Sequence, residues 1–303
     1  MQLFPKKLSQ IYLVLFVSAF LTITGNFTFF QKTILIYPLS ENWLFLGSLF
    51  FFLFTFLAAL LLLFCYRVTT KPILIALLMI SAIVSYSTNN YGIVFDHNMI
   101  LNTFETDTSE FLDLVSFKSI LYFFIFGLLP SIFVLKVKLI KISFKAQLWE
   151  RIKTFLVLVI IFVIIVLTFS KHYSSFAREN RDLRLYITPT YYLYSATKFV
   201  DSKFATSTKP FKEIGLDAKL NKKTDTRRLV ILVVGETARA DHMSLNGYDR
   251  NTNPYLEKEE IISFDKMTSC GTDTALSVPC MFSLLDRSSY NHAKGKNMSN
   301  VLD

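Results

Sequence analysis

Hydrophobic residues form five long runs in the first 170 residues of this chain, separated by short polar segments. A helix that crosses a bilayer needs about 20 predominantly apolar residues. A cleaved signal peptide would explain the first run and leave the other four unexplained. We therefore predict an α-helical membrane domain over residues 1–170, with about five transmembrane helices at Ile11–Phe30, Trp43–Tyr66, Pro72–Ser87, Ile120–Val137 and Phe155–Ser170.

Lysine and arginine residues cluster in the segments on one side of these helices. Two precede the first helix, two join the second to the third, and six join the fourth to the fifth: Lys136, Lys138, Lys141, Lys145, Arg151 and Lys153. Such residues accumulate in cytoplasmic loops, and an odd number of spans then puts everything after Lys171 on the other side. The pattern predicts a multi-pass membrane protein whose C-terminal part lies outside the cytoplasm, which is the periplasm where the membrane is a bacterial inner membrane. It also explains the net charge of +9 without a nucleic-acid partner.

The rest of the chain has the composition of a water-soluble segment, since it holds 20 of the 32 Lys and Arg residues and 16 of the 23 Asp and Glu residues. We interpret residues 171–215 as a periplasmic connector and residues 216–303 as the first part of a periplasmic domain. Within the connector, Phe176–Leu185 is expected to be either an amphipathic helix on the membrane surface or a solvated helix packed on the next domain. Three tyrosines suit the membrane interface: Tyr191, Tyr192 and Tyr194.

A short apolar run, Leu229–Val234, is rich in β-branched residues and has the pattern of a strand buried on both faces of a parallel sheet. Ligands of open α/β sheets bind just beyond the carboxyl ends of the strands. Glu236 falls at that place, where a carboxylate is able to ligate a divalent metal. The alternative is an acidic residue that favours the N-terminus of a helix.

A second polar segment, Thr268–Ser283, combines a turn with a predicted helix start. Gly271 allows a tight turn, and Thr272 to Thr274 are residues that favour the start of a helix. A threonine hydroxyl there becomes a nucleophile when a metal or a base activates it. The alternative is simple helix capping. Pro279 is expected to end this element.

The three cysteines fit the predicted topology. Cys65 lies in the second span and is expected to be a buried thiol. Cys270 and Cys280 lie on the periplasmic side, where a disulfide forms and persists. The alternative is a metal-binding pair, which nine intervening residues without a nearby histidine disfavour.

Four segments taken together resemble the phosphoethanolamine transferases of the lipid A type, which include the mobile colistin-resistance enzymes. They are Gly235–His242 (GETARADH), Asn246–Tyr248 (NGY), Cys270–Thr274 (CGTDT) and Ser277–Ser283 (SVPCMFS). The resemblance implies a membrane anchor followed by the N-terminal part of an α/β domain with an alkaline-phosphatase-like, or sulfatase-like, fold.

The resemblance also implies roles for individual residues. Thr274 matches the nucleophile that carries phosphoethanolamine covalently, and Glu236 and Thr274 match ligands of a Zn²⁺ cofactor. Cys270 and Cys280 match a family disulfide.

In the loop between the third and fourth spans, the resemblance assigns three residues to the donor lipid: Asn102, Thr106 and Glu110. Their spacing of four residues puts them on one face of a helix. The alternative is an ordinary solvated helix face.

The implied reaction moves phosphoethanolamine from phosphatidylethanolamine to lipid A or another lipopolysaccharide group. Modified lipid A is less negative, so cationic peptides such as polymyxins bind it less well. The family's other zinc ligands lie further downstream, and neither Asp96-His97 nor Asp241-His242 matches them, so we expect these 303 residues alone to be inactive. The alternatives are a non-catalytic truncated membrane remnant and a sulfatase-like phosphodiesterase.

Overall fold

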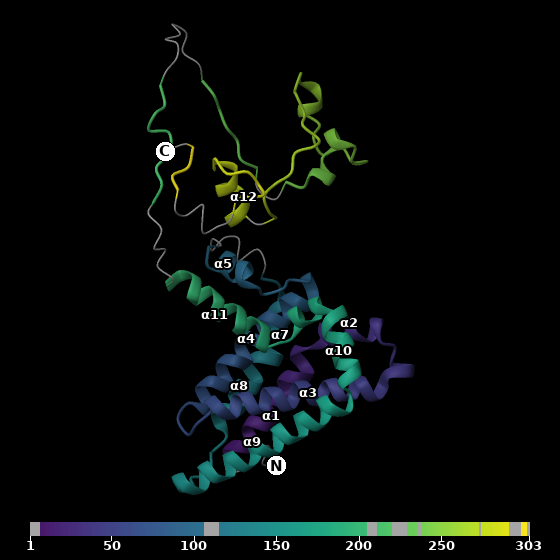
Figure 1. Cartoon of the computed structure of the whole chain (residues 1–303), viewed down its shortest axis with the longest axis vertical. Helices are drawn as coiled ribbons and strands as arrows, with labels where there is room; N and C mark the ends of the chain where they lie inside the picture. The colour runs from purple at the N-terminus through teal and green to yellow at the C-terminus, as the bar shows by residue number, and fades with distance from the viewer. Residues whose placement is uncertain are drawn as a thin grey trace. The chain divides into compact units, whose positions relative to one another are not determined.

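The computed structural model describes residues 7–105, 115–204, 211–219, 229–235, 238–272, 274–290 and 298–301. The chain divides into two compact units, Met1–Phe204 and Ala205–Asp303. The first unit is a bundle of helices (Figure 1). Its elements, in chain order, are α1 (Gln10–Gly25), α2 (Phe27–Ile36), α3 (Leu39–Phe64), α4 (Thr70–Tyr91), α5 (His97–Glu105), α7 (Phe117–Phe123), the π-helix η1 (Phe124–Leu128), α8 (Leu129–Lys136), α9 (Phe144–Thr168), α10 (Ser170–Glu179), the 3-10 helix η2 (Arg181–Tyr186) and α11 (Thr190–Phe204).

Four helices in the described part of the chain are long and apolar enough to cross a membrane. They are α3, α4, α9 and the continuous helix that α7, η1 and α8 form together. The pair α1 and α2 passes the same test jointly, with a bend of 58° between its halves, and raises the number to five. These five elements coincide with the five predicted spans.

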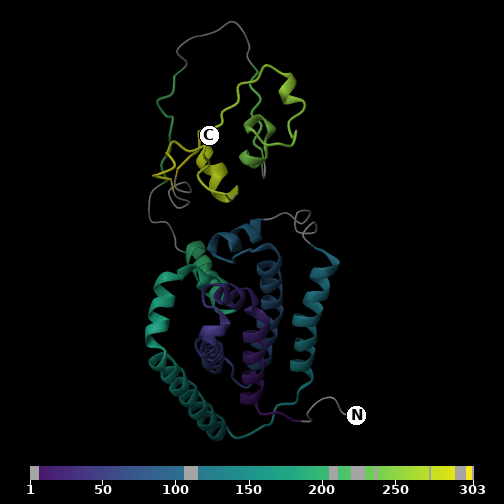
Figure 2. The ribbon, with the colours of Figure 1, turned by 90° about the vertical axis from the view of Figure 1, so that its right-hand side faces the viewer.

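The core of the bundle lies where α1, α3 and α4 meet, and Leu13, Ala58 and Leu78 are completely buried there. By contrast, α9 runs along the outside of the bundle and leads into α10 (Figure 2). The side chains of Leu156, Ile160 and Ile164 on α9 are 53–57% exposed. Exposed aliphatic side chains of this kind are favourable in contact with lipid chains.

The third and the fifth span are among those that extend beyond the hydrophobic runs predicted. The fifth begins at Phe144 instead of Phe155, because Ser143 caps the helix by accepting a hydrogen bond from the Ala146 N–H (3.4 Å). The polar residues that follow Ser143 are compatible with a helix, but they carry no hydropathy signal. The third span ends at Gly92, whose φ of +68° is the left-handed conformation that glycine adopts at helix C-termini.

The break between α1 and α2 is stabilised by the buried side chain of Asn26, which is 1% exposed. Its Nδ2 donates to the Thr188 carbonyl (2.8 Å), and its Oδ1 accepts from the Thr188 N–H (2.9 Å). Gly25 makes this approach possible, because a Cβ there would lie 3.3 Å from Thr188 Cγ2. The Asn26–Thr188 pair therefore joins the first span to a segment 162 residues later.

The fourth span contains one turn of π-helix because of Pro130. Proline has no N–H to continue the α-helical ladder, and the wider turn of η1 accommodates the gap just before it. Gly127 lies in this turn, and a Cβ there would be 3.1 Å from the Ala82 Cβ of α4. A small residue at this position lets the third and fourth spans pack closely.

Polar side chains connect the helix ends on the side of the basic loop. Gln10 Nε2 donates to the Cys65 carbonyl and to Thr70 Oγ1, both at 2.7 Å. Gln147 Nε2 donates in turn to Gln10 Oε1. Lys71 Nζ donates to the Leu135 carbonyl (2.7 Å). These bonds hold together the ends of α1, α3, α4, α8 and α9.

The apolar face of the predicted Phe176–Leu185 helix packs on the membrane helices themselves. Phe176 of α10 packs on Phe29 and Phe45, with ring centroids 6.3 and 5.8 Å apart. Leu183 of η2 joins the same cluster. The segment therefore packs on the bundle, and its position at the membrane surface or against the next domain stays a prediction.

One predicted interface tyrosine is also buried. Tyr192 is 6% exposed, and its hydroxyl lies 3.1 Å from Ser81 Oγ of α4. Burial raises the pKa of Tyr192 to about 12. Tyr191 is half-buried and Tyr194 is exposed, so the three tyrosines do not share one environment.

The second unit contains short helices in its described residues. They are η3 (Ala240–His242), η4 (Ser244–Asn246), η5 (Leu256–Lys258) and α12 (Thr274–Met281). The predicted strand Leu229–Val234 is not formed: its residues pair with no other described segment, and their exposure ranges from 41% to 87%. A strand that is apolar on both faces needs neighbours on both sides, and the described residues of this unit provide none.

A second correction concerns α12, which continues through Pro279 to Met281 instead of ending there. A proline inside so short a helix costs about one backbone hydrogen bond. The sulfur atoms of Cys270 and Cys280 are bonded, and their Cα atoms lie 6.3 Å apart. This disulfide joins the segment before α12 to the last turn of the helix.

We predict that Asn26→Ala lowers the free energy of unfolding by about 1–3 kcal/mol, because it leaves the buried N–H and carbonyl of Thr188 without partners. The measurement is thermal unfolding of the purified chain in detergent. Asn42→Ala is the control, since the Asn42 side chain makes one exposed bond to the Pro38 carbonyl. Equal melting temperatures for the two variants would contradict the prediction.

We also predict that Cys270 and Cys280 are unreactive toward alkylation until they are reduced. Closing this ring stabilises the folded state by roughly 2–3 kcal/mol in the chain-entropy model. After denaturation without reductant, iodoacetamide should modify Cys65 alone, as read by peptide mass spectrometry, and all three cysteines after reduction. Cys65 is the internal control because it is free. Labelling of Cys270 or Cys280 before reduction excludes the bond.

Candidate functional site

Thr274 is the first residue of α12 and is exposed at the start of the helix. The turn before it is built around Gly271, whose N–H donates to Ser269 Oγ (3.1 Å). A Cβ at Gly271 would overlap Leu276 Cδ2, so the first turn of the helix packs directly on the glycine. Together with the disulfide, this packing holds the candidate nucleophile at a defined position.

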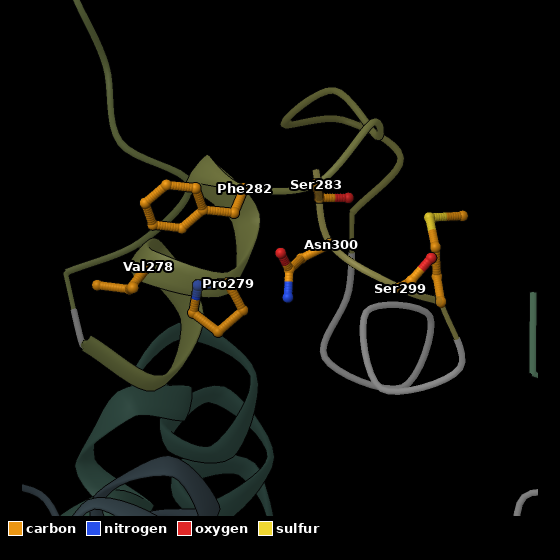
Figure 3. A pocket seen from close by; sticks show the side chains of 7 residues that line it. Val278, Pro279, Phe282, Ser283, Ser299 and Asn300 are labelled. Atoms are coloured by element: carbon orange, nitrogen blue, oxygen red, sulfur yellow. The ribbon is translucent and has the colours of Figure 1, made fainter. Parts of the chain in front are cut away.

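A cavity of about 310 Å³ lies against the other end of α12 (Figure 3). Val278, Pro279 and Phe282 form an apolar wall, and Ser283, Met298, Ser299 and Asn300 complete the lining. Thr274 is not among the lining residues, and no ionisable side chain is either. The cavity therefore has no charge with which to bind a phosphate group, and it is separate from the candidate nucleophile.

The segment that carries the GETARADH motif forms a local polar cluster. Asp241 accepts hydrogen bonds from Arg239 Nε (3.0 Å) and Nη2 (2.6 Å), and it lies 3.0 Å from His242 Nδ1. Arg239, and then His242, hold the pKa of Asp241 well below its ordinary value. The His242 ring packs against Tyr248 at 4.8 Å. This carboxylate is therefore occupied by its neighbours within the motif.

The NGY motif closes the same cluster. Asn246 Nδ2 donates to the Ala240 carbonyl (3.0 Å). Gly247 follows with a φ of +92°, a conformation that side chains other than that of glycine rarely adopt. Thr252 Oγ1 donates to the His242 carbonyl (2.7 Å). The asparagine and the glycine of this motif therefore shape the turn around His242.

The zinc half-site predicted from Glu236 and Thr274 is only partly described. Glu236 lies outside the described residues. Across the described ranges, no three His, Cys, Asp or Glu side chains come together in a way that could hold a metal ion. Tight zinc sites use about three or four protein ligands. The described residues therefore do not fit a zinc site by themselves.

Of the three predicted donor-lipid residues, the structure describes Asn102, which is half-buried on α5. Thr106 and Glu110 lie outside the described residues. Asp96 caps the start of α5, because its Oδ1 accepts from the Met99 N–H (2.8 Å). This role agrees with leaving the Asp96-His97 pair out of the metal site.

Contacts with α11 determine where α5 lies on the bundle. The rings of Phe104 and Phe199 stack with centroids 5.2 Å apart, and His97 packs on the same Phe199 at 6.1 Å. The helix that carries Asn102 is therefore attached to α11. Through the buried Tyr192 hydroxyl, α11 is attached to α4.

A lysine–tyrosine pair on α11 was not foreseen from the sequence. Lys198 Nζ lies 4.8 Å from the centre of the Tyr194 ring, and their hydrogen bond raises the pKa of Lys198. The spacing of Tyr191, Tyr194 and Lys198 along the chain is the signal that would have put them on one helix face.

Comparison with known protein families agrees with this division of the chain. The family model "Phosphoethanolamine transferase EptA/EptB" matches residues 53–204, and the "Sulfatase" model matches residues 228–303. The first match covers most of the membrane unit, and the second covers the segment that holds the GETARADH, NGY and CGTDT motifs.

Individual relatives show the same two-part similarity. The chain is 40% identical to "Phosphatidylethanolamine transferase Mcr-1" of Escherichia coli over 99% of its own length and 57% of the relative. It is 30% identical to "Phosphoethanolamine transferase EptA" of Salmonella typhimurium, over 98% of the chain and 55% of the relative. The chain thus spans about half the length of the curated relatives it matches.

A solved structure supports the fold. The integral membrane lipooligosaccharide phosphoethanolamine transferase A (EptA) of Neisseria meningitidis superposes with a TM-score of 0.89 at 30% identity, over 99% of this chain and 56% of that one. These comparisons confirm the resemblance drawn from the motifs. They also confirm the predicted fold class, a helical membrane domain followed by the N-terminal part of a sulfatase-like domain. The chain belongs to the EptA/EptB family of phosphoethanolamine transferases.

Proposed function

We propose that this chain provides the membrane domain and the nucleophile of an enzyme that transfers phosphoethanolamine from phosphatidylethanolamine to lipid A or another lipopolysaccharide group. The observation that supports this most directly is the family match across residues 53–204, which includes α5 and Asn102. The acceptor is suggested by a further relative, "Kdo(2)-lipid A phosphoethanolamine 7''-transferase" of Escherichia coli, which is 47% identical over 53 residues.

In the proposed reaction, the Thr274 hydroxyl oxygen attacks the phosphorus of the donor lipid. The bond from phosphorus to the glycerol oxygen breaks, and diacylglycerol leaves with the proton that Thr274 gave up. An acceptor hydroxyl or protonated phosphate oxygen then attacks the phosphorus of the Thr274 phosphoethanolamine ester. The bond from phosphorus to the Thr274 oxygen breaks, and that oxygen takes up the acceptor's proton to regenerate the hydroxyl. The exposed position of Thr274 at the start of α12 supports this role, because both substrates need access to it.

Several parts of the proposal rest on the family resemblance. They are zinc as the cofactor with Glu236 and Thr274 among its ligands, the donor-lipid role of Asn102, Thr106 and Glu110, and modification of lipid A as a cause of polymyxin resistance. The orientation rests on the basic loop between α8 and α9, which we place in the cytoplasm. Residues beyond Lys171 then lie in the periplasm, on the outer side of the inner membrane.

Two other functions make different predictions. A sulfatase-like phosphodiesterase would release phosphoethanolamine to water, whereas a transferase moves it to a second lipid. The large membrane unit favours a lipid substrate. A non-catalytic membrane remnant would show neither activity, and the inactivity of residues 1–303 alone stays a prediction.

We predict that Thr274→Ala abolishes transfer in a chimera in which residues 1–303 replace the aligned part of the Escherichia coli relative Mcr-1. Loss of a covalent nucleophile lowers the rate by more than about 1000-fold. The measurement is mass spectrometry of lipid A from a host whose own lipid A is unmodified. Thr272→Ala is the matched control, and lipid A from cells with this variant should still carry the phosphoethanolamine adduct.

Two arms of this experiment separate the alternatives. Residues 1–303 expressed alone should give no adduct, and an adduct that depends on Thr274 would show that this segment is sufficient. Release of free phosphoethanolamine by the chimera, without modified lipid A, would favour the phosphodiesterase.

We further predict that Asn102→Ala in the same chimera lowers kcat/KM for phosphatidylethanolamine by about tenfold, as expected when a hydrogen bond to a charged group is lost. Thr103→Ala is the control. It is exposed on the same helix, and its hydroxyl donates to the Met99 carbonyl within that helix (2.7 Å). The rate is measured with labelled donor lipid in vesicles. Equal rates for the two variants would remove Asn102 from the donor site.

A further inference from the structure

An open cleft of about 370 Å³ lies at the end of the membrane bundle where α1 and α9 begin. Leu15, Ile140 and Ile142 contribute apolar surface to it, and Gln147, Glu150 and Lys153 contribute polar groups. The cleft is next to the start of α4, whereas α5 follows the other end of that helix. It is therefore separate from the donor-lipid residues discussed above.

The hydrogen-bond network at the base of the cleft leaves one acceptor without a donor among the described residues. Gln10 must point its Nε2 toward the Cys65 carbonyl, because that oxygen can only accept. Gln10 Oε1 then faces Gln147, which must donate through its Nε2. Gln147 Oε1 is left with no hydrogen-bond partner among the described residues, although Gln147 is buried, with 8% of the residue exposed. A buried acceptor of this kind favours a ligand with N–H or O–H groups.

The charged residues of the cleft are also available to a ligand. Glu150 and Lys153 both line it, and neither forms an ion pair with a described residue. Lys153 Nζ lies 5.2 Å from the centre of the Trp149 ring. Trp149 is 60% exposed, and exposed tryptophans of membrane helices lie at the level of the lipid headgroups. The cleft thus presents one carboxylate, one ammonium group and one free acceptor at headgroup depth.

We propose that this cleft binds a phospholipid with a primary-ammonium headgroup, taken from the leaflet on the side of the basic loop. The lipid ammonium group bonds to Glu150 and Gln147 Oε1, the phosphate lies beside Lys153, and an acyl chain follows the apolar wall. This is a second lipid site, beyond the proposed transfer reaction. It does not depend on Thr274 or Asn102.

The residues in the cleft distinguish this ligand from other phospholipids. The surrounding lysines attract anionic lipids in general, but a purely anionic headgroup offers Glu150 no positive partner. A choline headgroup has the right net charge, but it carries no N–H group to donate to Gln147 Oε1. A primary ammonium group satisfies both acceptors.

The test is photo-crosslinking of the full chain in phosphatidylcholine vesicles that contain a trace of phosphatidylethanolamine with a photoreactive acyl chain. Peptide mapping should place cross-links in residues 9–15 and 140–154. Unlabelled phosphatidylethanolamine should reduce these cross-links, and equal amounts of phosphatidylglycerol or extra phosphatidylcholine should not. Equal competition by phosphatidylglycerol, or cross-links spread evenly along α9, would overturn the proposal.

Two variants locate the site independently. Glu150→Gln should lower cross-linking in the cleft roughly twofold to fivefold, the effect of losing an exposed ion pair. Glu179→Gln is the matched control, because Glu179 is an exposed carboxylate on α10 that accepts from Ser175 Oγ. Ile140→Trp should lower cross-linking by filling the cleft. Unchanged cross-linking in both Glu150→Gln and Ile140→Trp would also overturn the proposal.

Discussion

The Asn26–Thr188 pair is the interaction on which the rest of the membrane unit depends. In a bilayer, each backbone N–H and carbonyl must find a partner within the protein, and a span that bends by 58° interrupts its own ladder. Asn26 acts as a substitute peptide group and bonds to both backbone groups of Thr188. The connector is thereby held on the bundle, with η2 immediately before Thr188 and α11 immediately after it.

This attachment links the bend to the candidate donor site. Held by the pair at its start, α11 buries Tyr192 against α4 and presents Phe199 to the rings of α5. The position of Asn102 therefore follows from contacts made far along the chain. At the other end of the bundle, the hydrogen bonds of Gln10 likewise join helix ends through a buried polar side chain. Within the described part of the chain they leave one acceptor without a donor, in the cleft for which we propose a second lipid.

The motif segments of the second unit depend on local interactions, whereas hydrogen bonds of Ser299 with Lys212 and Ile214 join residues far apart in the unit. The disulfide, the Gly271 turn and the Arg239–Asp241 pair each join residues close in sequence, and they shape the motifs without a sheet. The run Leu229–Val234 shows the limit of such contacts. Its apolar side chains are exposed in the structure, although their pattern is that of a buried strand. Burying them requires partner strands that the described residues do not provide.

The sequence by itself determined the membrane spans, the family motifs and the expectation of a disulfide between Cys270 and Cys280. Hydropathy over about 20 residues and short motifs are local properties, so no tertiary information is needed to recognise them. Only the tertiary structure decided the bend at Asn26, the burial of Tyr192, the docking of α10 and the position of the Gln147 acceptor, which has no donor among the described residues. Each of these depends on partners that are distant along the chain, and no periodicity or spacing encodes which partner a buried polar group will find.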